Sequence, residues 1–164
     1  MTNLHRIARE TVNSAVERGW TVATAESLTA GMVTAMLADT PGASGMLQGG
    51  VVSYQNSVKA DILGVPRELL DAVGSVDGGV AEAMAAGARR VCGSDIAVSA
   101  TGVAGPEEHS GKAVGTVFIG IATAEGSSSF PYSFEGSRAE IRALSCAAAL
   151  ERLLQALSSA GYRA

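Results

Sequence analysis

Three apolar runs in this chain each end in a polar or glycine-bearing loop, and this pattern restricts the fold more than any other feature. The first run, Trp20 to Ala25, is followed by residues 26–31 and then by a helical segment, Met32 to Ala38. The other two runs are Met46 to Tyr54 and Asp95 to Ala100. In open α/β sheets, ligands bind where the carboxyl ends of such strands meet helix N-termini. The pattern therefore predicts an α/β fold with a binding site at one end of its sheet.

The remaining elements follow from apolar periodicity. Gly49 and Gly50 indicate a bulge or a close backbone approach in the second strand, and Ser137 and Glu140 have the spacing of a capping box. The 164 residues are expected to form one domain. The order of the elements predicts a three-layer α/β/α sandwich with a mixed, mostly parallel sheet. The other predicted helices are Asn3 to Arg18, Val58 to Leu63, Pro66 to Ala72, Val80 to Val91 and Ile141 to Leu157, and the other strands are Val114 to Ala122 and Ser127 to Phe134.

Composition argues against several classes of protein. The formal net charge is −4 and the only basic pair is Arg89-Arg90, so no nucleic-acid-binding surface is expected. No window approaches the roughly 18 apolar residues of a membrane span, so we expect no membrane partner and a cytoplasmic protein. Cys92 and Cys146 lie singly in alanine-rich helical segments and are predicted to be free thiols. With only two histidines and no paired ligand spacing, neither a metal ion nor another cofactor is expected.

Ser27 is the candidate nucleophile because it lies at the junction of the first strand and the following helix. Serine and threonine are also preferred helix caps, so Ser27 or Thr29 could instead cap that helix. The glycines of the α/β-hydrolase nucleophile elbow are absent around Ser27. Neither His5 nor His109 has an evident acidic partner for a serine triad. If Ser27 attacks a substrate, its base is therefore not expected to be a histidine.

Lysine is the other available base, and only Lys59 and Lys112 among the twelve cationic residues are lysines. Lys59 follows a strand end and has small neighbours. A desolvated lysine can lose its proton, which arginine cannot, and can then act as general base for a nearby serine. The alternative is a solvated lysine on the surface of a helix. The spacing of residues leaves both interpretations open.

Four motifs, in order from about Leu4 to Leu157, resemble those of the CinA C-terminal domain family. The motifs are residues 25–31 (AESLTAG), residues 50–56 (GVVSYQN) with Lys59 and residues 63–65 (LGV), residues 101–106 (TGVAGP), and residues 114–117 (VGTV). That family includes the bacterial nicotinamide-nucleotide amidases. The resemblance implies a deamidase that converts nicotinamide mononucleotide to nicotinate mononucleotide and ammonia, a step in pyridine-nucleotide salvage. It also implies that residues 1–164 form a single amidase domain that forms homo-oligomers.

The resemblance assigns roles to individual residues. Ser27 corresponds to the nucleophile, Lys59 to the general base, and Tyr54 to the tyrosine that completes the catalytic neighbourhood. The helix start near residues 29–31 is expected to offer N–H groups to the tetrahedral oxyanion. The arginines near the start of the last helix are candidates for the substrate phosphate, although both could be solvated. The predicted substrate-binding residues are Glu26, Thr29, Ala30, Gly31, Thr101, Gly102, Arg138 and Arg142.

Two features depart from the family pattern. Ala30 stands where the family often has glycine, and the loop after Pro106 is poorer in glycine than usual. That loop contains Glu107 and Glu108, and two carboxylates near a phosphate are unfavourable. An amidase for another carboxamide therefore remains an alternative. A non-catalytic nucleotide-binding or interaction protein of the competence or damage-inducible type is an alternative from a different class.

Overall fold

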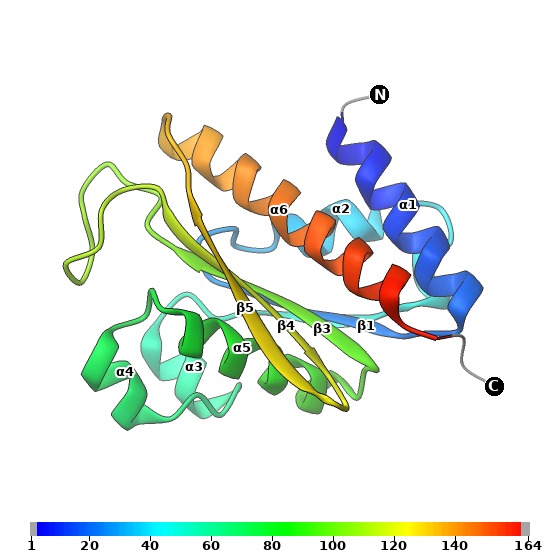
Figure 1. The fold of residues 1–164 in the computed structure, drawn as a ribbon, viewed down its shortest axis with the longest axis horizontal. Helices are drawn as coiled ribbons and strands as arrows, with labels where there is room; N and C mark the ends of the chain where they lie inside the picture. Colours follow the sequence, from blue (N-terminus) through cyan, green and yellow to red (C-terminus); the bar gives the residue numbers. More distant parts are fainter. Residues whose placement is uncertain (1–2, 162–164) are drawn as a thin grey trace.

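The computed structural model describes residues 3–161, and its centre is a five-stranded sheet with the order β2-β1-β3-β4-β5 (Figure 1). Strand β1 pairs in parallel with β2 and β3, whereas β4 pairs antiparallel with β3 and β5. Four of the five strands therefore run in the same direction, which confirms the predicted mixed, mostly parallel sheet. The strands are β1 (Val22–Glu26), β2 (Leu47–Val52), β3 (Ile96–Gly102), β4 (Thr116–Thr123) and β5 (Gly126–Ser133).

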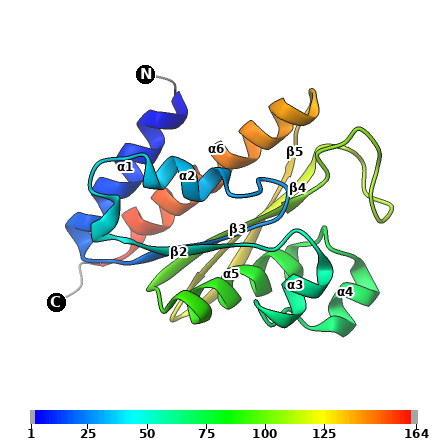
Figure 2. The same cartoon turned by 180° about the vertical axis from the view of Figure 1, so that it is seen from behind.

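Helices cover both faces of the sheet, as Figures 1 and 2 show from opposite sides. One face carries α1 (Asn3–Arg18), α2 (Met32–Ala38) and α6 (Arg138–Ser159), and the other carries α3 (Asn56–Asp61), α4 (Arg67–Val73) and α5 (Gly78–Cys92). A short 3₁₀ turn, η1 (Ala43–Gly45), precedes β2. Each face has its own buried apolar cluster. The three-layer α/β/α sandwich is thus confirmed.

Within residues 3–161, no helix combines the length and the apolar character that a membrane span requires.

Most element boundaries lie within two residues of the predicted ones. Strand β1 begins at Val22 rather than Trp20, because the Trp20 N–H donates to Ala15 O and closes the end of α1. The predicted capping box is confirmed, since Ser137 Oγ accepts from the Glu140 N–H and the Glu140 carboxylate accepts from the Ser137 N–H. Helix α3 begins at Asn56, two residues before the predicted start.

Gly50 makes the predicted close approach, and the unpaired residue of the irregularity in β2 is Gln48, directly before the glycine pair. The pairing of β1 with β2 shifts register between Val22 and Ala23, which marks an irregularity opposite the start of β2. A Cβ atom on Gly50 would lie 2.3 Å from Thr24 Oγ1 and 2.4 Å from Thr34 Oγ1. Those two hydroxyls share a hydrogen bond of 2.6 Å. Only glycine therefore leaves space for this contact between β1, β2 and α2.

The chain connections around β1 create a crevice at the carboxyl ends of the parallel strands. The chain passes from β1 to β2 through α2 on one face, and returns to β3 through α3, α4 and α5 on the other. Ligand sites in open α/β sheets lie where the strand order reverses in this way. The segments after β1, β2 and β3, which begin at Ser27, Ser53 and Val103, lie at this end of the sheet.

Candidate active site

Lys59 and Ser27 are in direct contact although 32 residues separate them in the chain. Lys59 Nζ lies 2.9 Å from Ser27 Oγ, and it also contacts the carbonyl oxygens of Ser53, at 2.8 Å, and Tyr54, at 3.1 Å. The Lys59 side chain comes from α3 and is only 1% exposed. Burial disfavours the ammonium form and lowers the pKa of Lys59 to about 8. The lysine is therefore a buried partner of Ser27 rather than a solvated side chain.

A tight turn holds Ser27 at the end of β1. The Ser27 N–H donates to Ala100 O at 2.9 Å, and Ser27 O accepts from the Ala30 N–H at 3.1 Å. Ala30 and Gly31 have φ angles of 49° and 95°, in the left-handed region that glycine adopts most easily. The turn therefore forms with alanine at the position where glycine was the expected residue.

Glu26 caps α2 from inside the protein. Its carboxylate accepts hydrogen bonds from the backbone N–H groups of Gly31, Val33 and Thr34 and from the Thr34 hydroxyl, at 2.7 to 3.0 Å. Negative charge at a helix N-terminus is favourable because it satisfies free N–H groups and the helix dipole. Gly31 is the formal N-cap and contributes no side chain, so neither Ser27 nor Thr29 has the capping role that the sequence left open.

The hydrogen bonds of Glu26 change which amides can stabilise an oxyanion. The expected donors were the N–H groups of residues 29–31, but the Gly31 N–H is bound to Glu26 and the Ala30 N–H is bound to Ser27 O. The N–H groups of Leu28 and Thr29 have no hydrogen-bond acceptor within residues 3–161. The structure therefore moves the candidate donors to the two residues that directly follow Ser27.

Arg142 fixes the same turn from α6. Its Nε donates to Leu28 O at 2.8 Å and its Nη2 donates to Thr29 O at 3.1 Å. These bonds fix the carbonyl groups of Leu28 and Thr29, the two residues whose N–H groups are the candidate oxyanion donors. Arg142 does not line the pocket described below, so the structure gives it a different position from the predicted phosphate contact.

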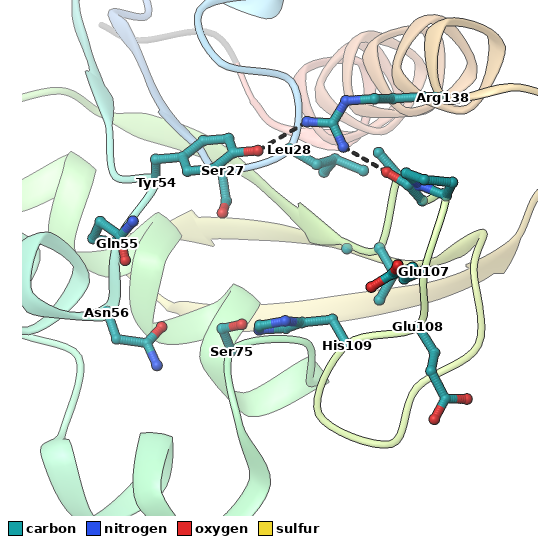
Figure 3. Close-up of a pocket in the computed structure, with 15 residues that line it drawn as sticks. Ser27, Leu28, Tyr54, Gln55, Asn56, Ser75, Glu107, Glu108, His109 and Arg138 are labelled. Atoms are coloured by element: carbon teal, nitrogen blue, oxygen red, sulfur yellow. Dashed lines mark hydrogen bonds between the residues drawn. The ribbon is translucent and has the colours of Figure 1, made fainter.

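A pocket of about 600 Å³ opens in front of Ser27 (Figure 3). Four segments surround it, namely the turn after β1, the residues after β2, Ser75 between α4 and α5, and the loop after β3. The N-terminal residue of α6 completes the wall. The lining residues are Ser27, Leu28, Tyr54, Gln55, Asn56, Ser75, Gly102, Val103, Ala104, Gly105, Pro106, Glu107, Glu108, His109 and Arg138.

Arg138 spans one side of this pocket. Its Nη1 donates to Gly105 O at 2.7 Å and its Nη2 donates to the Tyr54 hydroxyl at 2.9 Å, as the dashed lines in Figure 3 show. A guanidinium group has five N–H donors, so donors remain for an anionic ligand. Of the two predicted arginines, only Arg138 lies in the pocket lining.

The structure brings together some of the predicted site residues and separates others. Ser27, Tyr54, Gly102 and Arg138 line the pocket, and Lys59 lies behind Ser27. Thr101 is buried, and its hydroxyl donates to Ser75 O at 2.6 Å, outside the lining. The other predicted residues outside the lining are Glu26, Thr29, Ala30, Gly31 and Arg142.

Sequence reasoning did not identify the pocket residues Gln55, Asn56 and Ser75 as functional. Gln55 and Asn56 directly follow Tyr54, so their position after a strand end was an available signal. Ser75 has no such local signal. It reaches the site because Thr101 binds its carbonyl oxygen, and because Gly74, with a φ angle of 77°, lets Ser110 approach closely.

Other reactive groups lie outside this chemistry. Cys92 and Cys146 are free thiols, as predicted. Burial and the nearby Glu26 charge raise the pKa of Cys146 to about 12, so its thiol stays protonated. Within residues 3–161, no three His, Cys, Asp or Glu side chains are grouped to hold a metal ion.

Comparisons with known proteins give a consistent result. The family model described as the CinA C-terminal domain matches residues 4–157. A CinA-like protein of Mycolicibacterium gilvum is 47% identical over 150 residues, which are 90% of this chain and 36% of that protein. This chain therefore spans little more than a third of the length of that curated relative.

Two solved structures share the whole fold. The competence/damage inducible protein CihA of Agrobacterium tumefaciens has a TM-score of 0.91 and 33% sequence identity, covering 97% of this chain and 98% of that chain. A CinA superfamily protein of Klebsiella pneumoniae has a TM-score of 0.92 and 27% identity, covering 96% of this chain and 99% of that chain.

Proposed function

This chain belongs to the CinA C-terminal domain family, and from that membership and the site geometry we propose that it is an amidohydrolase that deamidates nicotinamide mononucleotide. The observation that carries the proposal is the contact of 2.9 Å between Lys59 Nζ and Ser27 Oγ beside a pocket. A serine next to a lysine of lowered pKa is an activated nucleophile for acyl transfer. The products are nicotinate mononucleotide and ammonia.

The three neighbours of Lys59 Nζ fit both protonation states of the amine. The ammonium form has three N–H groups and donates to Ser27 Oγ and to the carbonyl oxygens of Ser53 and Tyr54. After Lys59 loses a proton, two N–H groups remain for the carbonyl oxygens, and the lone pair can accept the Ser27 O–H. This arrangement orients Lys59 as a general base for Ser27.

The reaction then proceeds in two acyl-transfer steps. Ser27 Oγ attacks the carboxamide carbon while its proton moves to Lys59 Nζ, and the N–H group of Leu28, which lines the pocket, stabilises the oxyanion. Lys59 returns the proton to the leaving nitrogen, so ammonia departs and an ester remains on Ser27. Water attacks this ester, gives a proton to Lys59 and releases the acid, and the proton restores the Ser27 hydroxyl.

The opposite side of the pocket supports a nucleotide substrate. A volume of about 600 Å³ falls within the range typical of small-molecule sites. Arg138 has N–H donors left for the substrate phosphate, and its bond to the Tyr54 hydroxyl holds the guanidinium on this side of the pocket.

The decisive experiment measures ammonia release from nicotinamide mononucleotide by the wild type and by the Ser27→Ala and Lys59→Ala variants. We expect a loss of at least about 10³-fold in both variants, because nucleophile and base act as one unit. Circular dichroism would verify that both variants fold. A wild type that releases no ammonia between pH 6 and 9 would end this proposal and favour a non-catalytic binding protein.

A second candidate is an amidase for a different carboxamide. The observation in its favour is that Glu107 and Glu108 line the pocket, where they oppose a phosphate. A panel of carboxamides with and without phosphate separates the two candidates by kcat/KM.

A further inference from the structure

The two carboxylates of the pocket have no ion-pair partner within residues 3–161. Glu107 and Glu108 both line the pocket, and both side chains are exposed. Within residues 3–161 the ion pairs are Arg6–Glu10 and Arg67–Asp61, which involve neither carboxylate. Two carboxylates and the Arg138 guanidinium therefore line the same pocket, and neither carboxylate belongs to an ion pair within residues 3–161.

The cations near the site make their hydrogen bonds to other groups. Lys59 lies behind Ser27, Arg142 binds Leu28 O and Thr29 O, and Arg138 binds Tyr54 and Gly105. No lysine or arginine within the described part of the chain donates a hydrogen bond to Glu107 or Glu108. Both carboxylates can therefore interact with a cationic group of a ligand.

The two glutamates differ in direction. In Figure 3 the Glu107 side chain turns toward the interior of the pocket, whereas the Glu108 carboxylate points away from Ser27. We infer that Glu107 makes this pocket selective for carboxamides whose amide-bearing ring carries a positive charge. The inference rests on the proposed function, because it concerns the substrate of the same Ser27 site.

The physical reason is charge complementarity in a partly enclosed space. A carboxylate near a cationic ring is stabilised at the reduced dielectric of a pocket, and a neutral ring of the same shape gains nothing from it. The pyridinium ring of nicotinamide mononucleotide is such a cation. Its phosphate would lie against Arg138, so opposite charges of the ligand would face opposite charges of the pocket.

The test compares two ligands that differ in ring charge and share the amide, ribose and phosphate. These are nicotinamide mononucleotide, with a cationic ring, and its 1,4-dihydro form, with a neutral ring. Calorimetry on the Ser27→Ala chain gives a dissociation constant for each without turnover. We expect tighter binding of the cationic ligand, and a preference that weakens as salt is added.

Glu107→Gln in the Ser27→Ala background should lower this preference by about three- to fivefold, as expected for one partly screened charge pair. Glu108→Gln is the matched control from the same loop and should have a smaller effect. Glu151→Gln, an exposed carboxylate on α6, should have none. Because both loop glutamates are exposed, these changes should leave folding intact.

Three results would overturn the inference. The two ligands could bind with equal affinity, the cationic ligand could show no measurable binding, or Glu107→Gln could leave the preference unchanged. The proposed function fails by a different result, the absence of ammonia release from the wild type. A Glu107-dependent preference for the cationic ring without ammonia release would retain the selectivity and exclude the amidase.

Discussion

The two walls of the pocket are built in opposite ways. The turn wall is the segment 26–31, of which Ser27 and Leu28 line the pocket, and in it Glu26 is 1% exposed and Thr29 is fully buried. Its backbone N–H groups donate to Ala100 O and to the Glu26 carboxylate, and its carbonyl groups accept from Arg142. The loop wall, residues 105–112, is exposed from Pro106 to Gly111 and is held by a backbone pair between His109 and Lys112 and by Arg138 at Gly105.

This difference separates two requirements of an enzyme. Acyl transfer needs the nucleophile, base and oxyanion donors fixed to a fraction of an ångström, and a buried, multiply bonded turn provides that. Selectivity among substrates can be changed by charge on an exposed loop at little cost in folding free energy. Substitutions in the two walls should therefore affect different measured quantities.

The largest effect is expected from Glu26→Ala in the turn wall. The change removes the acceptor of three backbone N–H groups and leaves these groups in a largely dehydrated position. We expect the free energy of unfolding to fall by about 3 kcal/mol. Urea unfolding measures it, and ammonia release should fall with it, because the Ser27 turn loses its support.

Glu140→Ala is the matched control, because Glu140 also caps a helix but lies exposed in the box with Ser137. Its effect on unfolding should be clearly smaller than that of Glu26→Ala. An equal loss in both variants would show that burial does not distinguish these two caps.

Arg142→Ala should give the next largest effect. Loss of the bonds to Leu28 O and Thr29 O lets the candidate oxyanion donors move, and such misplacement lowers kcat by about 10- to 100-fold. Arg138→Ala, in contrast, should mainly raise KM for the mononucleotide. Steady-state kinetics of both variants on the same substrate separates the two roles, and a change confined to KM in Arg142→Ala would contradict a positioning role.

The pH dependence of kcat/KM tests the buried base, because it reports the pKa values of the ligand-free protein. Because burial lowers the pKa of Lys59 to about 8, its neutral form increases as the pH rises through 8. Activity should rise about tenfold between pH 7 and 9 and then level off. The unfolded chain binds this proton more tightly, so folding stability should also increase above pH 8, and Lys59→Met should abolish that increase. A flat profile under rate-limiting chemistry would exclude Lys59 as the base.

The smallest effect is expected from His109→Ala in the loop wall. His109 is exposed, and its hydrogen bonds within residues 3–161 are backbone bonds to Lys112, which alanine can retain. Unfolding free energy should stay within about 0.5 kcal/mol of the wild type, and KM should change by only a few-fold. A large loss of kcat would mean that the loop takes part in the chemistry, and the two walls would no longer differ.

Local sequence patterns were sufficient to predict the helices and strands of this protein. Helix α1 was predicted with the observed boundaries, and the Ser137–Glu140 capping box was identified from spacing alone. A strand end and a rare lysine made Ser27 and Lys59 candidates, and the resemblance to the CinA C-terminal domain family assigned their roles. These features depend on residues that are near one another in sequence, where periodicity and capping preferences are strong.

The direction of the polar side chains depended on tertiary structure. Glu26 turns back to α2 instead of the substrate, Thr101 binds Ser75 O, and Arg142 binds the Ser27 turn while Arg138 reaches the pocket. Each outcome depends on a contact whose partner is set by packing of the two helical layers on the sheet. The sequence by itself therefore determined which residues could react, and only the folded chain decided which of them face the pocket, because rotamers and burial follow from distant neighbours.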